Sequence, residues 1–360
     1  MKTKLLLTLI LVMIFSVSAL ADTEYSFRES KEFESAGISK VNIDISKGDV
    51  ELRKSTSSKI EIDLKYEIYA DDKEDAEDVK NDCEFEVESR NGEIDINVEL
   101  TKYHKKKDTL SKIFSGSWND GLKAYLLVKI PDGLKVYMKS SSADLEASDL
   151  RVEIEIDGSS SDVKLKDIEG VFKADLSSGD VDIYSHIGNI SVDGNSSDIR
   201  IESAKGNVTL ETSSGDGYIN DIEGSVDVRA NSGDYRLSEI TDDLDIKTSS
   251  GDIYLDNAGG SVRAVCSSGD IRLRELSSKE GDFDISTTSG DVFLSVSPDF
   301  SGYFSLKSTS GSINSRIDEL EDRRSRKRRS SRPMVEGSVG SGNGEVFVVT
   351  TSGDITVDRY

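Results

Sequence analysis

The sequence of 360 residues has few of the side chains that most often carry chemistry, with only two histidines and two cysteines. Two histidines leave little capacity for acid–base catalysis near neutral pH. The G-x-S-x-G, H-E-x-x-H and G-x-x-x-x-G-K-[ST] motifs are also missing. We therefore predict a protein that is not an enzyme, with no catalytic residue, metal ligand or cofactor. A carboxylate pair that hydrolyses a polysaccharide is the enzymatic alternative.

Long apolar runs are scarce, and the one that is present lies at the N-terminus. Two lysines precede an apolar run from Leu5 to about Val17, and an Ala-Leu-Ala sequence that matches a cleavage site ends at Ala21. This pattern predicts a signal peptide over residues 1–21 and export to the periplasm, the cell surface or the extracellular space. A membrane anchor is the alternative, although the run is shorter than the roughly 20 residues of a typical span. No transmembrane span is expected in the mature chain.

The sequence has fewer basic than acidic residues. It contains 45 Lys and Arg residues and 69 Asp and Glu residues, which gives a formal net charge of -24. Such acidity argues against nucleic-acid binding and favours solubility. The expected partners are instead envelope components, surface glycans or another envelope protein.

What the sequence has in abundance is a repeat of 18 residues, marked by an aspartate that follows Ser-Ser-Gly or a near variant of it. The strict register comprises Asp144, Asp162, Asp180, Asp198, Asp216, Asp234, Asp252 and Asp270, and Asp291 and Asp354 follow at longer spacings. Each aspartate opens a stretch of alternating apolar residues, which is typical of a half-buried strand, and a second such stretch follows in the same unit. A second glycine column, which includes Gly170 and Gly188, separates the two stretches.

A fixed period of this kind predicts a coil in which every turn copies the last. Eighteen extended residues give a perimeter of about 60 Å. The fold class we predict is all-β: a right-handed parallel β-solenoid (β-helix) with about 18 residues per turn and an irregular β-rich N-terminal cap. The right hand follows from the general crossover preference. An antiparallel sandwich is the alternative, but its hairpins would not require one fixed period.

The sequence predicts five regions. These are a signal peptide over 1–21, a β-rich cap merging into the first turns over 22–135, the regular solenoid over 136–320, a basic, Gly/Ser-rich insert over 321–344, and the last solenoid strand over 345–360. Asp49 in Ser-Lys-Gly-Asp predicts an earlier turn within the cap, and the segment from Asp71 to Asp82 predicts a short polar helix. After Asp270 we expect extra residues to enter as loops between strands that continue the coil.

These repeated units, Ser-Ser-Gly-Asp-Val-x-Ile with a later glycine and paired valines, resemble the bacterial "putative adhesin" family of unknown function. The resemblance covers about residues 40–360. It implies an exported or envelope-associated β-solenoid with no established enzymatic activity. We expect a structural, adhesive or scaffolding role at the bacterial cell envelope, and a module that binds glycans or an anionic surface, or that senses the state of the envelope, is the alternative. The resemblance assigns no catalytic residues. The basic insert is absent from the simplest form of the family.

Two interpretations of the aspartate column are open. Stacked carboxylates about 5 Å apart would repel each other by roughly 0.9 kcal/mol in water, and a calcium ion takes such oxygen ligands. The structural interpretation, which we favour, is that glycine supplies positive φ at the corner while Ser and Asp oxygens accept hydrogen bonds from backbone N–H groups. The calcium-binding pattern G-G-x-G-x-D is not reproduced.

The second candidate site is a run of cations that interrupts the repeat. It comprises Arg323, Arg324, Arg326, Lys327, Arg328, Arg329 and Arg332. Runs of like charge are usually interaction segments or solvated loops. The functional interpretation is docking onto an anionic surface such as lipid headgroups or an acidic polysaccharide.

Two single residues complete the sequence-based expectations. Cys266 stands in a column of small residues and is expected to be a buried free thiol. His186 has no histidine nearby and is expected at the surface.

Overall fold

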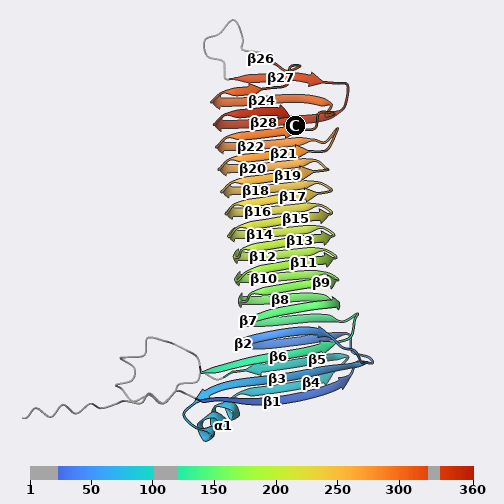
Figure 1. Cartoon of the computed structure of the whole chain (residues 1–360), viewed down its shortest axis with the longest axis vertical. Helices are drawn as coiled ribbons and strands as arrows, with labels where there is room; N and C mark the ends of the chain where they lie inside the picture. Colours follow the sequence, from blue (N-terminus) through green and yellow to red (C-terminus); the bar gives the residue numbers. More distant parts are fainter. Residues whose placement is uncertain (1–22, 101–120, 323–332) are drawn as a thin grey trace, which may run out of the picture.

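The computed structural model describes residues 23–100, 121–322 and 333–360 of the chain, and these residues form a β-solenoid (Figure 1). One α-helix and 29 strands are present in this part of the chain. The predicted signal peptide and the cationic run from Arg323 to Arg332 lie outside the described residues.

The regular coil has two strands in each turn, and each strand pairs in parallel with the strand two places along the chain. One sheet contains β8 (Glu153–Ser160), β10 (Phe172–Ser178), β12 (Ile190–Ser196), β14 (Val208–Ser214), β16 (Val226–Ser232), β18 (Leu244–Ser250), β20 (Val262–Ser268) and β22 (Phe283–Ser289). The other contains β9 (Val163–Glu169), β11 (Val181–Ile187), β13 (Ile199–Lys205), β15 (Gly217–Glu223), β17 (Tyr235–Ile240), β19 (Ile253–Ala258), β21 (Ile271–Leu276) and β23 (Val292–Val296). The pairing of Val163 with Val181 and of Val181 with Ile199 confirms the 18-residue turn.

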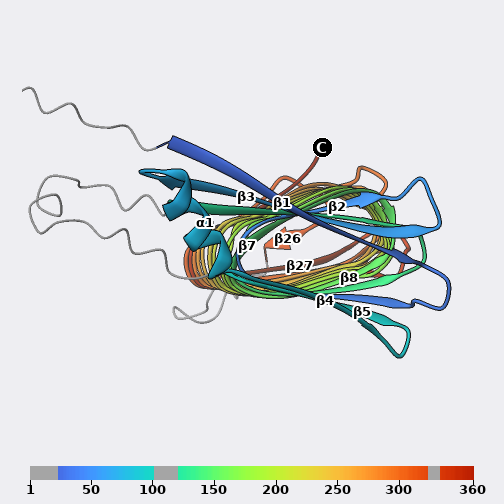
Figure 2. The ribbon, with the colours of Figure 1, turned by 90° about the horizontal axis from the view of Figure 1, so that it is seen from below.

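Alternation of apolar and polar residues places the core between the two sheets. In β9, Val163, Leu165 and Ile168 are at most 2% exposed, whereas the residues between them face solvent. Because each inward position stacks on the same position of the next turn, the core is a set of continuous apolar ladders. Seen along the axis, the coil is a flattened oval (Figure 2).

Glycine stands at most corners of both kinds, where the backbones of successive turns approach closely. Gly179, which precedes Asp180, has a φ of +119°, and a Cβ there would lie 2.1 Å from the carbonyl oxygen of Ser161. Gly170 has a φ of +152°, and a Cβ there would lie 2.0 Å from the carbonyl oxygen of Val152. A side chain at either position would push the stacked turns apart.

A second column with positive φ was not anticipated from the sequence. It consists of non-glycine residues with φ between 51° and 59°: Asp149, Asp167, Ser185, Ser203, Asp221, Glu239, Asn257 and Glu275. Asp and Asn tolerate this left-handed conformation better than most residues, and their frequency in the column reflects that preference.

The N-terminal cap covers the first turn of the coil. Its elements are β1 (Thr23–Glu34), β2 (Lys40–Lys54), β3 (Lys59–Ala70), α1 (Lys73–Asn81), β4 (Glu84–Arg90), β5 (Glu93–Glu99), β6 (Leu122–Ile130) and β7 (Lys135–Arg151). Strand β2 pairs in parallel with β7, so that Asp49 aligns with Asp144, which confirms the predicted early turn. The remaining strands add mostly antiparallel pairs and extend past the oval of the coil (Figure 2). The predicted short helix is confirmed as α1, and the side chain of Asp72 caps its N-terminus.

The distal end departs from chain order. Its strands are β24 (Gly302–Ser310), β25 (Ile313–Ser315), β26 (Glu321–Asp322), β27 (Met334–Val339), β28 (Gly344–Ser352) and β29 (Ile355–Arg359). Strand β28 lies between β22 and β24 (Figure 1). In the same way, β29 pairs with β23 on one side and with β25 on the other. Residues 345–360, predicted as the last solenoid strand, thus contain most of β28 and all of β29, and the turn that these strands form is inserted between two earlier turns.

The two single-residue expectations have opposite outcomes. Cys266 is 2% exposed and its thiol donates to the carbonyl oxygen of Gly251 at 3.3 Å, so the prediction of a buried free thiol is confirmed. The prediction of a surface position for His186 is wrong, because the residue is 1% exposed. It occupies an inward column between Ile168 and Ala204, where the repeat elsewhere places apolar residues.

Candidate functional site

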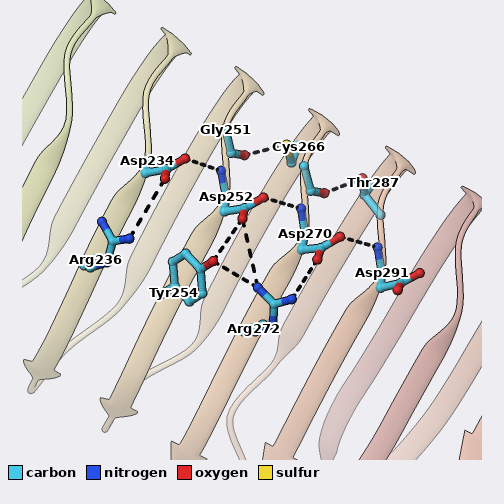
Figure 3. Close-up of polar contacts among 11 residues, drawn as sticks. Asp234, Arg236, Gly251, Asp252, Tyr254, Cys266, Asp270, Arg272, Thr287 and Asp291 are labelled. Atoms are coloured by element: carbon cyan, nitrogen blue, oxygen red, sulfur yellow. Dashed lines mark hydrogen bonds and ion pairs between the residues drawn. The ribbon is translucent and has the colours of Figure 1, made fainter.

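The aspartates of the repeat form a continuous ladder of hydrogen bonds along one corner of the coil. The Oδ1 atom of each aspartate accepts a hydrogen bond from the backbone N–H of the aspartate in the next turn (Figure 3). For example, Asp234 accepts from Asp252 at 2.9 Å, and Asp252 accepts from Asp270 at 2.8 Å. The full ladder runs through Asp144, Asp162, Asp180, Asp198, Asp216, Asp234, Asp252, Asp270, Asp291 and Asp354 and ends on the backbone N–H of Ser312.

This geometry shows what one oxygen of each carboxylate does. It bonds a backbone donor at the corner, as the structural interpretation requires. The backbone N–H of Ser312 lowers the pKa of Asp354, since a donor stabilises the charged form. Among residues 23–100, 121–322 and 333–360, no cluster of three or more His, Cys, Asp or Glu side chains is arranged to hold a metal ion.

The second oxygens face outward, and several bond to side chains of the adjacent column (Figure 3). Tyr254 donates its hydroxyl to Oδ2 of Asp252 at 2.9 Å. Arg272 donates to Oδ2 of Asp270 at 2.8 Å and to the Tyr254 hydroxyl at 3.0 Å. The guanidinium of Arg236 lies 4.0 Å from Oδ2 of Asp234.

These side chains belong to an alternating row on the outer face of the sheet, which we call the Arg–Tyr strip. It consists of Arg200, Tyr218, Arg236, Tyr254 and Arg272, which are aligned in register on five successive turns. Each guanidinium lies close to a ring of a neighbouring turn.

The distances show how closely the strip is packed. Arg200 lies 5.0 Å from the ring centre of Tyr218, and Arg236 and Arg272 lie 5.1 Å and 5.3 Å from that of Tyr254. Such cation–π contacts contribute roughly 0.5–1 kcal/mol each at exposed sites. Tyr218 is nevertheless 40% exposed, so the strip is both ordered and accessible.

An acidic groove of about 510 Å³ lies beside the first turns of the aspartate ladder. Its charged lining comprises Asp49, Glu51, Asp144, Glu146, Asp162, Lys164, Asp180 and Asp182. Partial burial, with a smaller contribution from the charge of Asp144, raises the pKa of Asp49. Acidic side chains therefore far outnumber basic ones in the lining of the groove.

The distal end has a different surface. Tyr303, Phe347 and Val349 are 38%, 38% and 43% exposed, and the rings of Tyr303 and Phe347 pack edge to face at 6.4 Å between centres. The strands that flank the predicted cationic run, β26 and β27, pair with each other and close this end of the stack.

The sequence analysis identified the aspartate column but not the Arg–Tyr strip. A signal for the strip was present, because its members stand two residues after an aspartate of the ladder in successive repeats. The mixture of two residue types in one column concealed it.

Comparison with solved structures finds matches at low sequence identity. One solved structure is a "putative lipid binding protein" from Parabacteroides distasonis, with 14% identity, 92% of this chain and 96% of that chain covered, and a TM-score of 0.32. A "putative adhesin" from Bacteroides fragilis has 10% identity, 92% and 97% coverage, and a TM-score of 0.32. A "putative cell adhesion protein" from Clostridium sporogenes has 11% identity, 93% and 100% coverage, and a TM-score of 0.21. No curated protein matches the chain.

A family model provides the assignment that these distant structures do not. The model described as Toastrack DUF4097 matches residues 38–256 and again residues 238–358, which together span the first turn, the regular coil and the inserted C-terminal turn. The chain belongs to the Toastrack DUF4097 family.

Proposed function

We propose that this protein is an exported, non-enzymatic β-solenoid with an adhesive or scaffolding role at the bacterial cell envelope, and that it binds surface glycans along the Arg–Tyr strip. The observation that carries the proposal is the alternation of arginine and tyrosine on consecutive turns of a rigid coil. Export follows from the predicted signal peptide. In the described ranges no helix is both long and apolar enough to cross a bilayer.

The spacing of the strip suits a linear polymer of sugars. Turns stack about 4.8 Å apart, so equivalent residues two turns apart, such as Tyr218 and Tyr254, recur about every 9.6 Å. This repeat is comparable with the length of a disaccharide unit in an extended glycan. Exposed tyrosine rings offer flat apolar faces, while guanidinium groups and carboxylates offer donors and acceptors for hydroxyl groups.

The charge on the strip favours neutral over anionic glycans. Arg272 is paired with Asp270, Arg236 lies near Asp234, and Arg200 is paired with Glu202. The arginines are thus largely compensated by neighbouring carboxylates. An acidic polysaccharide would meet the remaining negative charge of the aspartate ladder.

The test is binding of the purified protein to soluble neutral and acidic polysaccharides, measured by affinity electrophoresis. The double variant Tyr218→Ala/Tyr254→Ala should bind a neutral glycan about tenfold more weakly, because two stacking contacts are lost. Tyr303→Ala is the matched control, since Tyr303 is 38% exposed but lies on β24, in the opposite sheet. Equal loss in both variants, or no binding by the wild type, would contradict the proposal.

A second candidate function rests on the position of the two strands that flank the cationic run. Its flanking strands β26 and β27 form the distal end, opposite the cap (Figure 1). In the sequence, seven cations stand between these two strands, in a chain with a formal net charge of -24. We propose that this tip docks onto an anionic surface.

A further inference from the structure

The distal end of the coil contains a slot one turn high that the last residues of the chain fill. The slot lies between the turn formed by β22 and β23 and the turn formed by β24 and β25. Residues 344–359, which we call the C-terminal segment, occupy it. The hydrogen bonds of the aspartate ladder follow the same order of turns, because they run from Asp291 to Asp354 and then to Ser312.

The C-terminal segment is bonded on both sides. Gly290 and Val292 donate their backbone N–H groups to the carbonyl oxygens of Ser352 and Asp354 at 3.1 Å and 2.9 Å. On the other side, Ile355 donates to the carbonyl oxygen of Ser312 at 2.9 Å. Without the segment, two parallel strand edges would face each other unpaired, which is the condition under which another strand is recruited.

The segment also completes the core. Val346, Val348, Ile355 and Val357 are fully buried and continue the apolar ladders through the slot. Burial of each such side chain contributes roughly 1.5–3 kcal/mol relative to exposure. An empty slot is therefore strongly unfavourable, and the coil needs a strand of this sequence to be complete.

Nothing in the slot distinguishes the segment of its own chain from that of a second copy. The recognition elements are backbone edges and the repeated sequence Thr-Thr-Ser-Gly-Asp, which occurs at residues 287–291 and again at 350–354. The advantage of the chain's own segment is its tether, residues 340–343, which raises its effective concentration. This tether contains Gly340, which has a φ of +67°, and Gly342, and two glycines give it the freedom to open.

We propose that the slot is a strand-exchange site, in which the C-terminal segment of one copy of this chain completes the coil of another. Because donor and slot lie at the same end of each molecule, reciprocal exchange closes into a dimer joined tip to tip, with the two caps pointing outward. The proposal is independent of glycan binding, since the Arg–Tyr strip lies on earlier turns.

The test uses two full-length variants in a Cys83→Ala/Cys266→Ala background. One carries Asn314→Cys and the other Thr356→Cys, at positions that pair directly across β25 and β29 and so lie within the reach of a disulfide. The two are unfolded, refolded together at high concentration and oxidised. A matched pair combines Thr356→Cys with Thr209→Cys, an exposed position on β14. A single chain that carries both Asn314→Cys and Thr356→Cys, refolded at high dilution, reports the internal disulfide.

The expected result is a disulfide-linked species with twice the mass of one chain from the Asn314→Cys and Thr356→Cys mixture, with little from the matched pair. The idea is overturned if both mixtures give the same small amount of dimer while the doubly substituted chain closes its internal disulfide. The unsubstituted protein supplies an independent measurement by light scattering. Its dimer fraction should rise with the concentration at which it is refolded, and the mass of a single chain at every concentration would also overturn the proposal.

Discussion

The ring of Tyr235 lies over Gly217 in the preceding turn, in the space that a side chain on residue 217 would occupy. A Cβ on Gly217 would lie 2.4 Å from Cδ1 of Tyr235. The hydroxyl of the buried tyrosine is 2.6 Å from Oγ1 of Thr212, so its polar end is also satisfied. In other turns the same inward column holds Val181, Ile199 and their equivalents, one medium-sized side chain in each turn. Gly217 and Tyr235 together thus fill the core space that two medium-sized side chains fill in other pairs of turns.

This relationship predicts that the two positions are coupled. Gly217→Val should lower the free energy of unfolding by about 1–3 kcal/mol, because it overpacks the core against the ring. Adding Tyr235→Ile should restore much of that loss, since two medium-sized residues would then stack as they do elsewhere in the column. Urea unfolding followed by circular dichroism gives the comparison, with Tyr235→Ile alone as the control. If the effects of the two substitutions on the free energy of unfolding are purely additive, the packing of the Tyr235 ring does not depend on the absence of a side chain at residue 217.

The burial of His186 predicts a dependence of stability on pH. Burial lowers the pKa of His186, because the charged imidazolium is poorly solvated in the core. The backbone of Gly170 opposes this shift, but neither ring nitrogen makes a hydrogen bond of normal geometry. Below about pH 6.5 the unfolded state binds a proton that the folded state does not, so the free energy of unfolding falls as pH falls.

The measurement is the urea midpoint of the wild type and of His186→Ile between pH 7.5 and about pH 5, a range centred on the ordinary histidine pKa. The wild type should lose stability on the acid side, and His186→Ile should lose less, because an apolar residue matches Ile168 in the column. Carboxylates titrate at lower pH and contribute equally to both proteins. Parallel curves for the two proteins would contradict the prediction.

The aspartate ladder predicts a difference between two substitutions at the same position. Asp234→Asn keeps an oxygen that accepts from the backbone N–H of Asp252 and should change stability little. Asp234→Ala removes the acceptor and should cost about 0.5–1.5 kcal/mol. The melting temperature of both variants and of the wild type should be the same with calcium as with a chelator. A calcium-dependent rise in the wild type that Asp234→Asn abolishes would instead support the calcium interpretation.

The regular part of the coil could be predicted from the sequence because every turn repeats the same local pattern. The 18-residue spacing, the alternation and the glycine corners all describe local contacts between identical neighbours. The order of the distal turns was not predictable on this basis, since residues 308–312 (Ser-Thr-Ser-Gly-Ser) and 350–354 (Thr-Thr-Ser-Gly-Asp) fit the edge after Asp291 almost equally well. Because parallel strands pair equivalent positions of similar repeats, the pairing does not determine which repeat unit is next in the stack.

His186 was missed for a different reason. Its position 18 residues after Ile168 places it in the apolar column, so the repeat alone predicted burial. The expectation of a surface position rests on the absence of a histidine partner nearby and does not take this register into account. In a coil this regular, register decides which side a residue faces, and a single polar residue is accommodated at a cost.

The last prediction concerns the cationic run at the tip. In the wild type, binding to vesicles that contain anionic lipid should exceed binding to neutral vesicles and should fall with added salt. The variant with Arg323, Arg324, Arg326, Arg328 and Arg329 changed to serine should lose about 1 kcal/mol for each cation that contacts the surface. A matched variant removes five exposed cations of the coil instead, and should bind as the wild type does. It carries serine in place of Arg151, Lys173, Arg229, Lys247 and Arg263. Sedimentation with vesicles measures all three proteins, and equal, salt-insensitive binding would show that the run does not dock. Loss in the tip variant alone would place the contact at the distal end, where the flanking strands β26 and β27 pair with each other.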